Sequence, residues 1–278
     1  MLGSALLYAL TDIIIKIVGR QFRVWDIAFF RFGGGIIFIL LIFGWFGNPF
    51  KGNNIRLLIL RGSTGALAFL ALVTAIQRLP LSAAIMLLYS FPAFAALFSA
   101  VIFSERISLL QIVCIAGTLI GVGILLDFSP TGNLLGELIG LSAGMFAGAA
   151  VCFIRKLRET NGPVIIYLYF CLVGGMITFP PFLASPQLPA SPRDIFLIVF
   201  LVFIFLVAQL LMNQGFRYCR SWEGGLFLSS EILFTSIAGI CFMGDPVTWH
   251  FWIGGGIVIA SVLLLNIIPP EHPSPTND

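Results

Sequence analysis

The sequence predicts an all-α integral membrane protein whose ten transmembrane helices form two inverted repeats of five helices each. Composition is the first observation: 59% of the 278 residues are hydrophobic, only 10% are charged, and the mean hydropathy is +1.06. Water-soluble domains carry about 25% charged residues. The second observation is that the apolar residues fall into ten runs near the ~20 residues that a transmembrane helix needs. The third is a correspondence between the two halves of the chain.

The ten runs are separated by short breaks that contain Gly, Pro or Asn, such as the segments around Pro49 and Gly162. These residues favour turns over helix interiors. The predicted spans cover residues 2–18, 24–46, 56–76, 82–103, 108–127, 134–154, 163–183, 194–214, 222–243 and 248–268. Loops this short hold no soluble domain, and only the polar, Pro-rich tail 269–278 is expected to lack a fixed structure. The function is therefore expected to lie within the membrane.

The first half of the chain, residues 1–127, and the second half, residues 134–268, show similar features in the same order. An acidic residue follows the fourth span of each half, Glu105 in the first and Asp245 in the second. Because each half has an odd number of spans, the second half enters the membrane in the opposite orientation. Two inverted halves can open one central site to either side of the membrane in turn, which is typical of transporters.

The distribution of Lys and Arg favours cytoplasmic N- and C-termini. With that orientation the inner loops hold eight basic residues and the outer loops hold four, and basic residues concentrate on the cytoplasmic side of membrane proteins. The sequence thus predicts a multi-pass protein of the cell inner membrane, surrounded by the lipid bilayer. The net charge of +3 is scattered between the spans and forms no basic patch, so nucleic acid is not expected as a partner.

Cysteine and histidine give no sign of catalysis or of a metal site. The five cysteines lie singly in separate segments, and the two histidines, His250 and His272, lie outside the centres of the spans. Neither metal-ligand spacing nor a nucleophile–base motif is present. We therefore expect no metal, no cofactor, no catalytic residue and no enzymatic activity. A channel or a non-transporting structural membrane protein is the alternative to a transporter.

Polar residues inside the apolar spans are the candidates for substrate binding, because a charged group at the membrane centre costs about 2.5–3.5 kcal/mol. Glu231 lies in the middle of the apolar stretch 226–242. It is expected to take up and release a proton or to bind an ammonium group; a structural hydrogen bond to a neighbouring helix is the alternative. The candidate substrate-binding residues are Glu231, Tyr89, Ser90, Gln209, Asn213, Asp12, Lys16, Arg31 and Arg61.

Each of the other candidates has a structural reading beside the functional one. Asp12 and Lys16 lie one helical turn apart, so they can form an ion pair that serves either structure or a gate. Arg31 either attracts an anionic group or extends to the membrane surface, and Arg61 either binds substrate or anchors the orientation.

The remaining polar candidates are uncharged. Gln209 and Asn213 share a face of span 8, where amides line a cavity or bond to neighbouring helices. Tyr89 and Ser90 precede Pro92, whose missing N–H leaves a carbonyl unpaired and favours a polar environment.

Two predictions about packing follow from the same residues. Spans 1, 3, 4, 6, 8 and 9 are expected to surround the site, and spans 5 and 10 to lie at the periphery, because these two hold no charged residue in their middles. Glycines spaced by four residues predict close helix packing in spans 5 and 6. They are Gly117, Gly121, Gly136, Gly140, Gly144 and Gly148.

The motifs resemble the drug/metabolite transporter superfamily, and specifically its EamA-type branch, over residues 1–268. The residues that carry the resemblance are Asp12 and Lys16 in span 1, Phe29-Phe30-Arg31-Phe32 in span 2, Leu60-Arg61-Gly62 in span 3, Ser90-Phe91-Pro92 in span 4 and Glu105 before span 5. Residues 12–32 also resemble the S-adenosylmethionine-transporter branch. The family often has Glu-Pro in span 9, whereas Ile232 follows Glu231 here.

The resemblance implies a secondary active transporter that moves small metabolites by alternating access. Amino acids or amino-acid-derived compounds are the expected small-molecule substrates, and protons are the candidate coupling ion. A monomer or a homodimer is expected.

Overall fold

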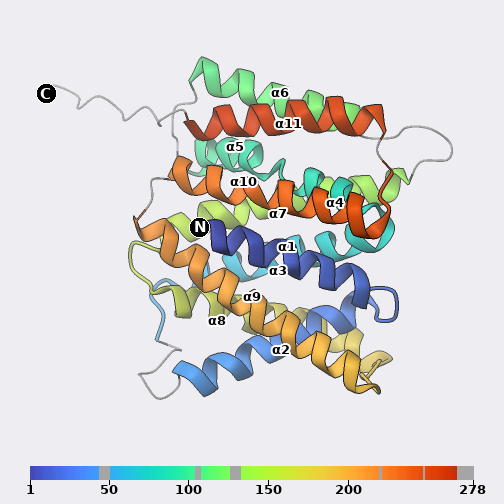
Figure 1. Ribbon diagram of the computed structural model, residues 1–278. Helices are drawn as coiled ribbons and strands as arrows, with labels where there is room; N and C mark the ends of the chain where they lie inside the picture. The colour runs from blue at the N-terminus through green and yellow to red at the C-terminus, as the bar shows by residue number, and fades with distance from the viewer. Residues whose placement is uncertain (44–50, 104–107, 126–132, 219–220, 247, 268–278) are drawn as a thin grey trace, which may run out of the picture.

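The computed structural model describes residues 1–43, 51–103, 108–125, 133–218, 221–246 and 248–267, and these residues contain helices and no strand. The described residues of the ten predicted runs are mostly helical (Figure 1). The elements are α1 (Leu2–Val18), α2 (Val24–Phe43), α3 (Ile55–Arg78), α4 (Leu81–Leu88), α5 (Phe91–Phe103), α6 (Leu109–Leu125), α7 (Leu134–Leu157), α8 (Pro163–Ala184), α9 (Pro192–Tyr218), α10 (Ser221–Ala238), the π-helical segment η1 (Gly239–Met243) and α11 (Trp249–Ile267).

Six helical segments within the described residues are long and apolar enough to cross a membrane. They are Val24–Ile42, Ile55–Arg78, Leu81–Ile102, Leu134–Leu157, Pro163–Ala184 and Pro192–Gly215, and shorter apolar helices cover Leu109–Ile124, Leu228–Met243 and Trp249–Leu264. Large apolar side chains also lie on the outside of the bundle, among them Leu41, Val101 and Phe242, which are 67%, 81% and 84% exposed. An apolar outer surface of this kind suits lipid and not water. The chain has the character of an integral membrane protein.

The fourth predicted span is divided into two helices. α4 ends at Leu88 and α5 begins at Phe91, next to Pro92, which has no N–H to continue the hydrogen-bond ladder. The Ser90 hydroxyl donates to the carbonyl of Leu87 at 2.7 Å and so satisfies one group at the break. The ninth span lacks a proline but changes its winding at Gly239, where the α-helix becomes a π-helical turn that ends at Gly244 with φ +70°. Both spans are therefore irregular.

The helices pack mainly between the two halves of the chain. α3 packs against α7, and α1 packs against α9; α5 packs against α7, and α1 packs against α10. α2 packs directly on α8, and α6 on α11. Figure 1 places α6 and α11 together at one edge of the bundle and α2 at the opposite edge, with α1 and α3 between them. The peripheral position predicted for spans 5 and 10 agrees with this arrangement.

The glycines of α7 lie where its backbone approaches other helices. A Cβ added at Gly140 would contact Leu87, and one added at Gly144 would lie 2.9 Å from the Leu87 carbonyl oxygen. At Gly148 it would lie 2.8 Å from backbone atoms of α5. Gly121 of α6 approaches the Gly254 carbonyl oxygen of α11 in the same way. The packing role predicted for these glycines is confirmed.

Gly148→Ala is expected to destabilise the protein by about 1–3 kcal/mol, because the new methyl group overlaps the α5 backbone, which cannot move without disturbing the bundle. Thermal unfolding of the purified protein in detergent measures the effect. Gly33→Ala is the matched control: no atom lies within 4 Å of its added Cβ, so its melting temperature should not fall. Equal melting temperatures for the two variants would contradict the packing role.

The orientation prediction can be tested on two exposed positions at opposite faces of the bundle. Asn53 and Asn161 hydrogen-bond to each other, which places the segment near Lys156 on the face that holds the loop before α3. Arg23 contacts Ser185 near Gln187. If the N-terminus is cytoplasmic, the thiol of a Lys156→Cys variant in a cysteine-free background should be shielded from an impermeant thiol reagent in intact cells. The thiol of a Gln187→Cys variant should be labelled. The opposite pattern would reverse the orientation.

Candidate functional site

Eight of the nine candidate residues are buried among the helices, and Lys16 is partly buried. They come from α1, α2, α3, the α4–α5 break, α9 and α10, which brings distant parts of the chain together. Within the described residues, no group of three or more His, Cys, Asp or Glu side chains could hold a metal ion. The buried polar residues form an acidic group and a basic group.

The acidic group consists of Asp12, Glu231 and Tyr89. The Asp12 carboxyl on α1 faces the Glu231 carboxyl on α10 within hydrogen-bonding range. The Tyr89 hydroxyl lies 3.0 Å from Glu231 Oε2 and 2.6 Å from the carbonyl oxygen of Leu228. A tyrosine hydroxyl has a single hydrogen to donate. Both contacts are therefore complete hydrogen bonds only when Glu231 carries a proton and donates it to Tyr89.

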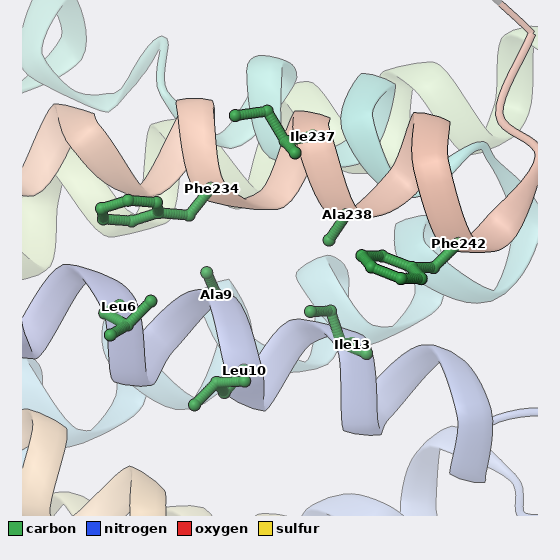
Figure 2. Close-up of a pocket in the computed structure, with 8 residues that line it drawn as sticks. All are labelled: Leu6, Ala9, Leu10, Ile13, Phe234, Ile237, Ala238 and Phe242. Atoms are coloured by element: carbon green, nitrogen blue, oxygen red, sulfur yellow. The ribbon is translucent and has the colours of Figure 1, made fainter.

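An apolar groove lies between α1 and α10, the helices that carry Asp12 and Glu231. Figure 2 shows its eight lining residues on these two helices, and its volume is about 160 Å³. The lining contains no polar side chain; it consists of Leu6, Ala9, Leu10, Ile13, Phe234, Ile237, Ala238 and Phe242. Asp12 and Glu231, on the same helices, are only 4% and 6% exposed. The two carboxyl groups are therefore shielded from lipid and lie on the inner side of this seam.

The basic group consists of Arg31 on α2 and Arg61 on α3, which are 1% and 4% exposed. Phenylalanine rings cover the Arg31 guanidinium: its central carbon lies 3.6 Å from the ring centre of Phe205 and 3.9 Å from that of Phe69. The Arg61 guanidinium lies 4.4 Å from the ring centre of Phe170. Cation–π contacts of this kind offset part of the cost of burying a positive charge.

Most donors of the basic group have no acceptor among the described residues. Nε, Nη1 and Nη2 of Arg31 lack a hydrogen-bond partner, as do Nε and Nη1 of Arg61. In the described part of the chain, neither guanidinium forms an ion pair with a carboxylate. Buried donors left unpaired cost about 1–3 kcal/mol each, and more when they are charged. Such donors are available to a bound anionic group.

Tyr8 lies between the two groups, although the sequence reading did not single it out. Its hydroxyl donates to Gln209 Oε1 at 2.8 Å, and its ring packs edge-on against Phe205. The hydroxyl is within electrostatic range of Asp12 and Glu231 as well as of the two arginines. Tyr8 precedes Asp12 by one helical turn, and this spacing was the available signal.

Lys16 does not pair with Asp12, contrary to the expected i,i+4 ion pair. Its ammonium group donates to the carbonyl oxygens of Ile76 at 2.6 Å and Leu79 at 2.5 Å. These carbonyls end α3, where the helix has no N–H left to satisfy them. Asp245 is nearby and accepts from the backbone N–H and the hydroxyl of Ser82 at the start of α4. Lys16 thus belongs to a cluster at the helix ends.

Ser90 and Asn213 have different surroundings from each other. Ser90 bonds to its own helix and faces Gly144 of α7, so its role is in packing at the α4–α5 break. Asn213 is 1% exposed, and neither atom of its amide has a hydrogen-bond partner among the described residues. It lies one turn beyond Gln209 on α9, which keeps it a candidate for substrate binding.

Three further residues of the basic group escaped the sequence reading. Tyr167 and Cys171, one turn apart on α8, are buried next to each other and lie within electrostatic range of Arg31. Gly65 lies one turn after Arg61, and a Cβ there would meet Arg61 Nη1 and lie 2.8 Å from the ring of Phe170. Glycine at this position lets the Arg61 side chain extend along α3 to Phe170.

Comparison with known proteins identifies the family. The family model of the EamA-like transporters matches residues 1–126 and again residues 134–267. This chain belongs to the EamA-like transporter family. The resemblance to the EamA-type branch of the drug/metabolite transporters is therefore confirmed, and this membership favours transport over catalysis.

Relatives whose names state a function are distant in sequence. "Pseudopaline exporter CntI" of Pseudomonas aeruginosa is 26% identical over 264 residues, which cover 91% of this chain and 89% of the relative. "Solute carrier family 35 member G1" of Homo sapiens is 22% identical over 76% of this chain and 61% of the relative. A solved crystal structure aligns with a TM-score of 0.62 at 16% identity, covering 95% of this chain and 94% of that chain, and supports the fold alone.

A double-mutant cycle tests the separation of Lys16 from Asp12. Lys16→Met is expected to lower stability by about 1.5–3 kcal/mol, because the α3 carbonyls lose a charged donor. Since the two side chains do not pair, the effects of Asp12→Asn and Lys16→Met should add to within about 0.3–0.5 kcal/mol in thermal or denaturant unfolding. Lys156→Met, at an exposed position of α7, is the control for loss of a lysine. A larger coupling between the first two variants would show that an ion pair does form.

Proposed function

We propose that this EamA-like protein is a secondary active transporter that moves amino acids or amino-acid-derived metabolites across the cytoplasmic membrane by alternating access. The observation that carries the proposal is the pair of buried groups, one acidic and one basic, between the helices of the two halves. A zwitterionic solute has one charge for each group. Its ammonium group suits Asp12 and Glu231, and its carboxylate suits Arg31 and Arg61.

The packing of the helices supports alternating access. The five helical spans of the first half can be matched in order with those of the second half: α1 with α7, α2 with α8, α3 with α9, α4–α5 with α10, and α6 with α11. Under this matching, each main helix–helix contact corresponds to another contact that is also observed. The contact of α3 with α7 becomes that of α9 with α1, and the contact of α5 with α7 becomes that of α10 with α1. The contacts of α2 with α8 and of α6 with α11 map onto themselves. Two inverted five-helix halves, with ten membrane crossings, would pack in this way.

Protons are the proposed coupling ion. Asp12 and Glu231 face each other, and two carboxylates at this range repel each other unless a proton lies between them. The Tyr89 hydroxyl lies 3.0 Å from Glu231 Oε2. A proton held here can be displaced when an ammonium group binds, which links substrate binding to proton release. The similarity to the pseudopaline exporter of Pseudomonas aeruginosa supports outward transport of the metabolite.

Counterflow in proteoliposomes tests the proposal. Vesicles preloaded with an unlabelled mixture of amino acids should accumulate labelled amino acids transiently, and an imposed pH gradient should drive the flux. A channel, the alternative reading, would show no stimulation by solute on the opposite side. Absence of stimulated flux across the whole mixture would contradict transport of amino acids.

Glu231→Gln separates coupling from folding. The variant keeps the size of the side chain and removes its charge, so a thermal unfolding curve close to the wild type is expected, together with loss of proton-driven flux. Exchange of labelled for unlabelled amino acid survives if Glu231 handles only the proton. Glu159→Gln, an exposed residue paired with Lys156, is the matched control and should behave as the wild type. Full pH-dependent uptake by the Glu231→Gln variant would exclude Glu231 as the coupling group.

A further inference from the structure

We propose that Arg31 and Arg61 together bind two carboxylate groups of the cargo, so that the preferred substrates are amino dicarboxylates and not simple amino acids. The inference rests on the proposed transport of amino-acid-like solutes and specifies which class of them fits the basic group. It starts from the number of charges that the buried site leaves unpaired.

Two guanidinium groups share one region of the protein. Both lie beside Phe170, at 4.8 Å for Arg31 and 4.4 Å for Arg61 from the ring centre, and each is within electrostatic range of the other. Arginine stays charged in proteins, so the pair carries two positive charges. In the described residues no carboxylate forms an ion pair with either group. One carboxylate would leave one of the two guanidinium groups unbalanced, and two carboxylates would satisfy both.

The aromatic rings determine how an anion can approach. The Arg31 guanidinium carbon lies 3.6 Å from the ring centre of Phe205 and 3.9 Å from that of Phe69, so both rings pack against the guanidinium group. The N–H groups point outward in that plane, and all three guanidinium nitrogens lack an acceptor among the described residues. A guanidinium edge matches the two oxygens of a carboxylate in a planar, bidentate pair. The ring-lined guanidinium of Arg31 therefore favours planar carboxylates over spherical anions.

Two neighbouring features support an anion site and not a purely structural one. The Tyr167 hydroxyl, a further donor, is buried beside Cys171 and within electrostatic range of Arg31. Gly65 and Gly35 provide the space: a Cβ at Gly65 would meet Arg61 and Phe170, and one at Gly35 would lie 2.8 Å from Cys171 Sγ and 3.1 Å from the Tyr167 hydroxyl. Glycines at both positions keep the donors in place.

Binding of defined probes tests the inference on the full-length protein in lipid nanodiscs. L-Glutamate, with two carboxylates and an ammonium group, is expected to raise the melting temperature at concentrations about tenfold lower than glycine requires. Succinate should bind less tightly than L-glutamate because it lacks the ammonium group. Equal stabilisation by glycine would overturn the requirement for two carboxylates, and equal stabilisation by inorganic phosphate would overturn the selectivity for planar carboxylates. Failure of L-glutamate to bind would overturn the substrate class.

Three variants assign the effect to the arginines. Arg61→Lys keeps the charge but loses the bidentate edge, and Gly65→Ala displaces the Arg61 side chain without changing any charge; each should weaken L-glutamate binding about tenfold and glycine binding less. Arg56→Lys, exposed near the start of the same helix, is the control and should leave both affinities unchanged. Unchanged discrimination between L-glutamate and glycine in folded Arg61→Lys and Gly65→Ala variants would overturn the assignment.

The two proposals fail in different ways. Counterflow of neutral amino acids without preference for L-glutamate would retain transport and remove the dicarboxylate inference. L-Glutamate binding that depends on Arg61, without counterflow of any amino acid, would retain the binding site and remove the proposed transport.

Discussion

Two buried arginine side chains, most of whose N–H donors find no acceptor among the described residues, impose the strictest constraint on this protein. A positive charge away from water is costly in any fold, and more so in a bilayer, where no solvent reaches the interior. The chain offsets part of this cost with rings and not with carboxylates: Phe69, Phe170 and Phe205 contact the guanidinium groups. Ring contacts stabilise the charge but leave the N–H edges open. The protein therefore keeps these donors ready for a partner from outside the chain.

The surrounding packing depends on this arrangement. Each ring comes from a different helix: Phe69 from α3, Phe170 from α8 and Phe205 from α9. These rings surround the guanidinium groups only when the three helices pack together next to α2. Gly174 of α8 shows how closely they meet, because an added Cβ there would lie within 2.5 to 2.6 Å of the Phe32 ring. The glycines of α7 likewise allow the α4–α5 break to pack closely against that helix, and Tyr89 at the break lies beside Glu231. Small residues thus position both polar groups.

The sequence predicted the helices well because their length and apolar content depend only on local composition. α1 was predicted at residues 2–18 and lies there, and the division of the fourth span follows from Pro92, which acts within its own helix. The partners of the buried side chains depend on contacts between distant segments, and these were predicted less well. Lys16 illustrates the difference: spacing placed it one turn from Asp12, but its ammonium group donates to carbonyls at the end of α3, while Asp12 lies near Glu231 of a distant helix.

The separation of the acidic group from the basic group is itself informative. A direct ion pair between Glu231 and Arg31 would satisfy both charges within the protein, and a ligand would then have to break it. Tyr8, whose hydroxyl donates to Gln209 on α9, is a neutral side chain within electrostatic range of both groups. Since buried opposite charges normally pair, keeping them apart is destabilising for the empty protein, and a solute that carries both charges relieves this cost when it binds.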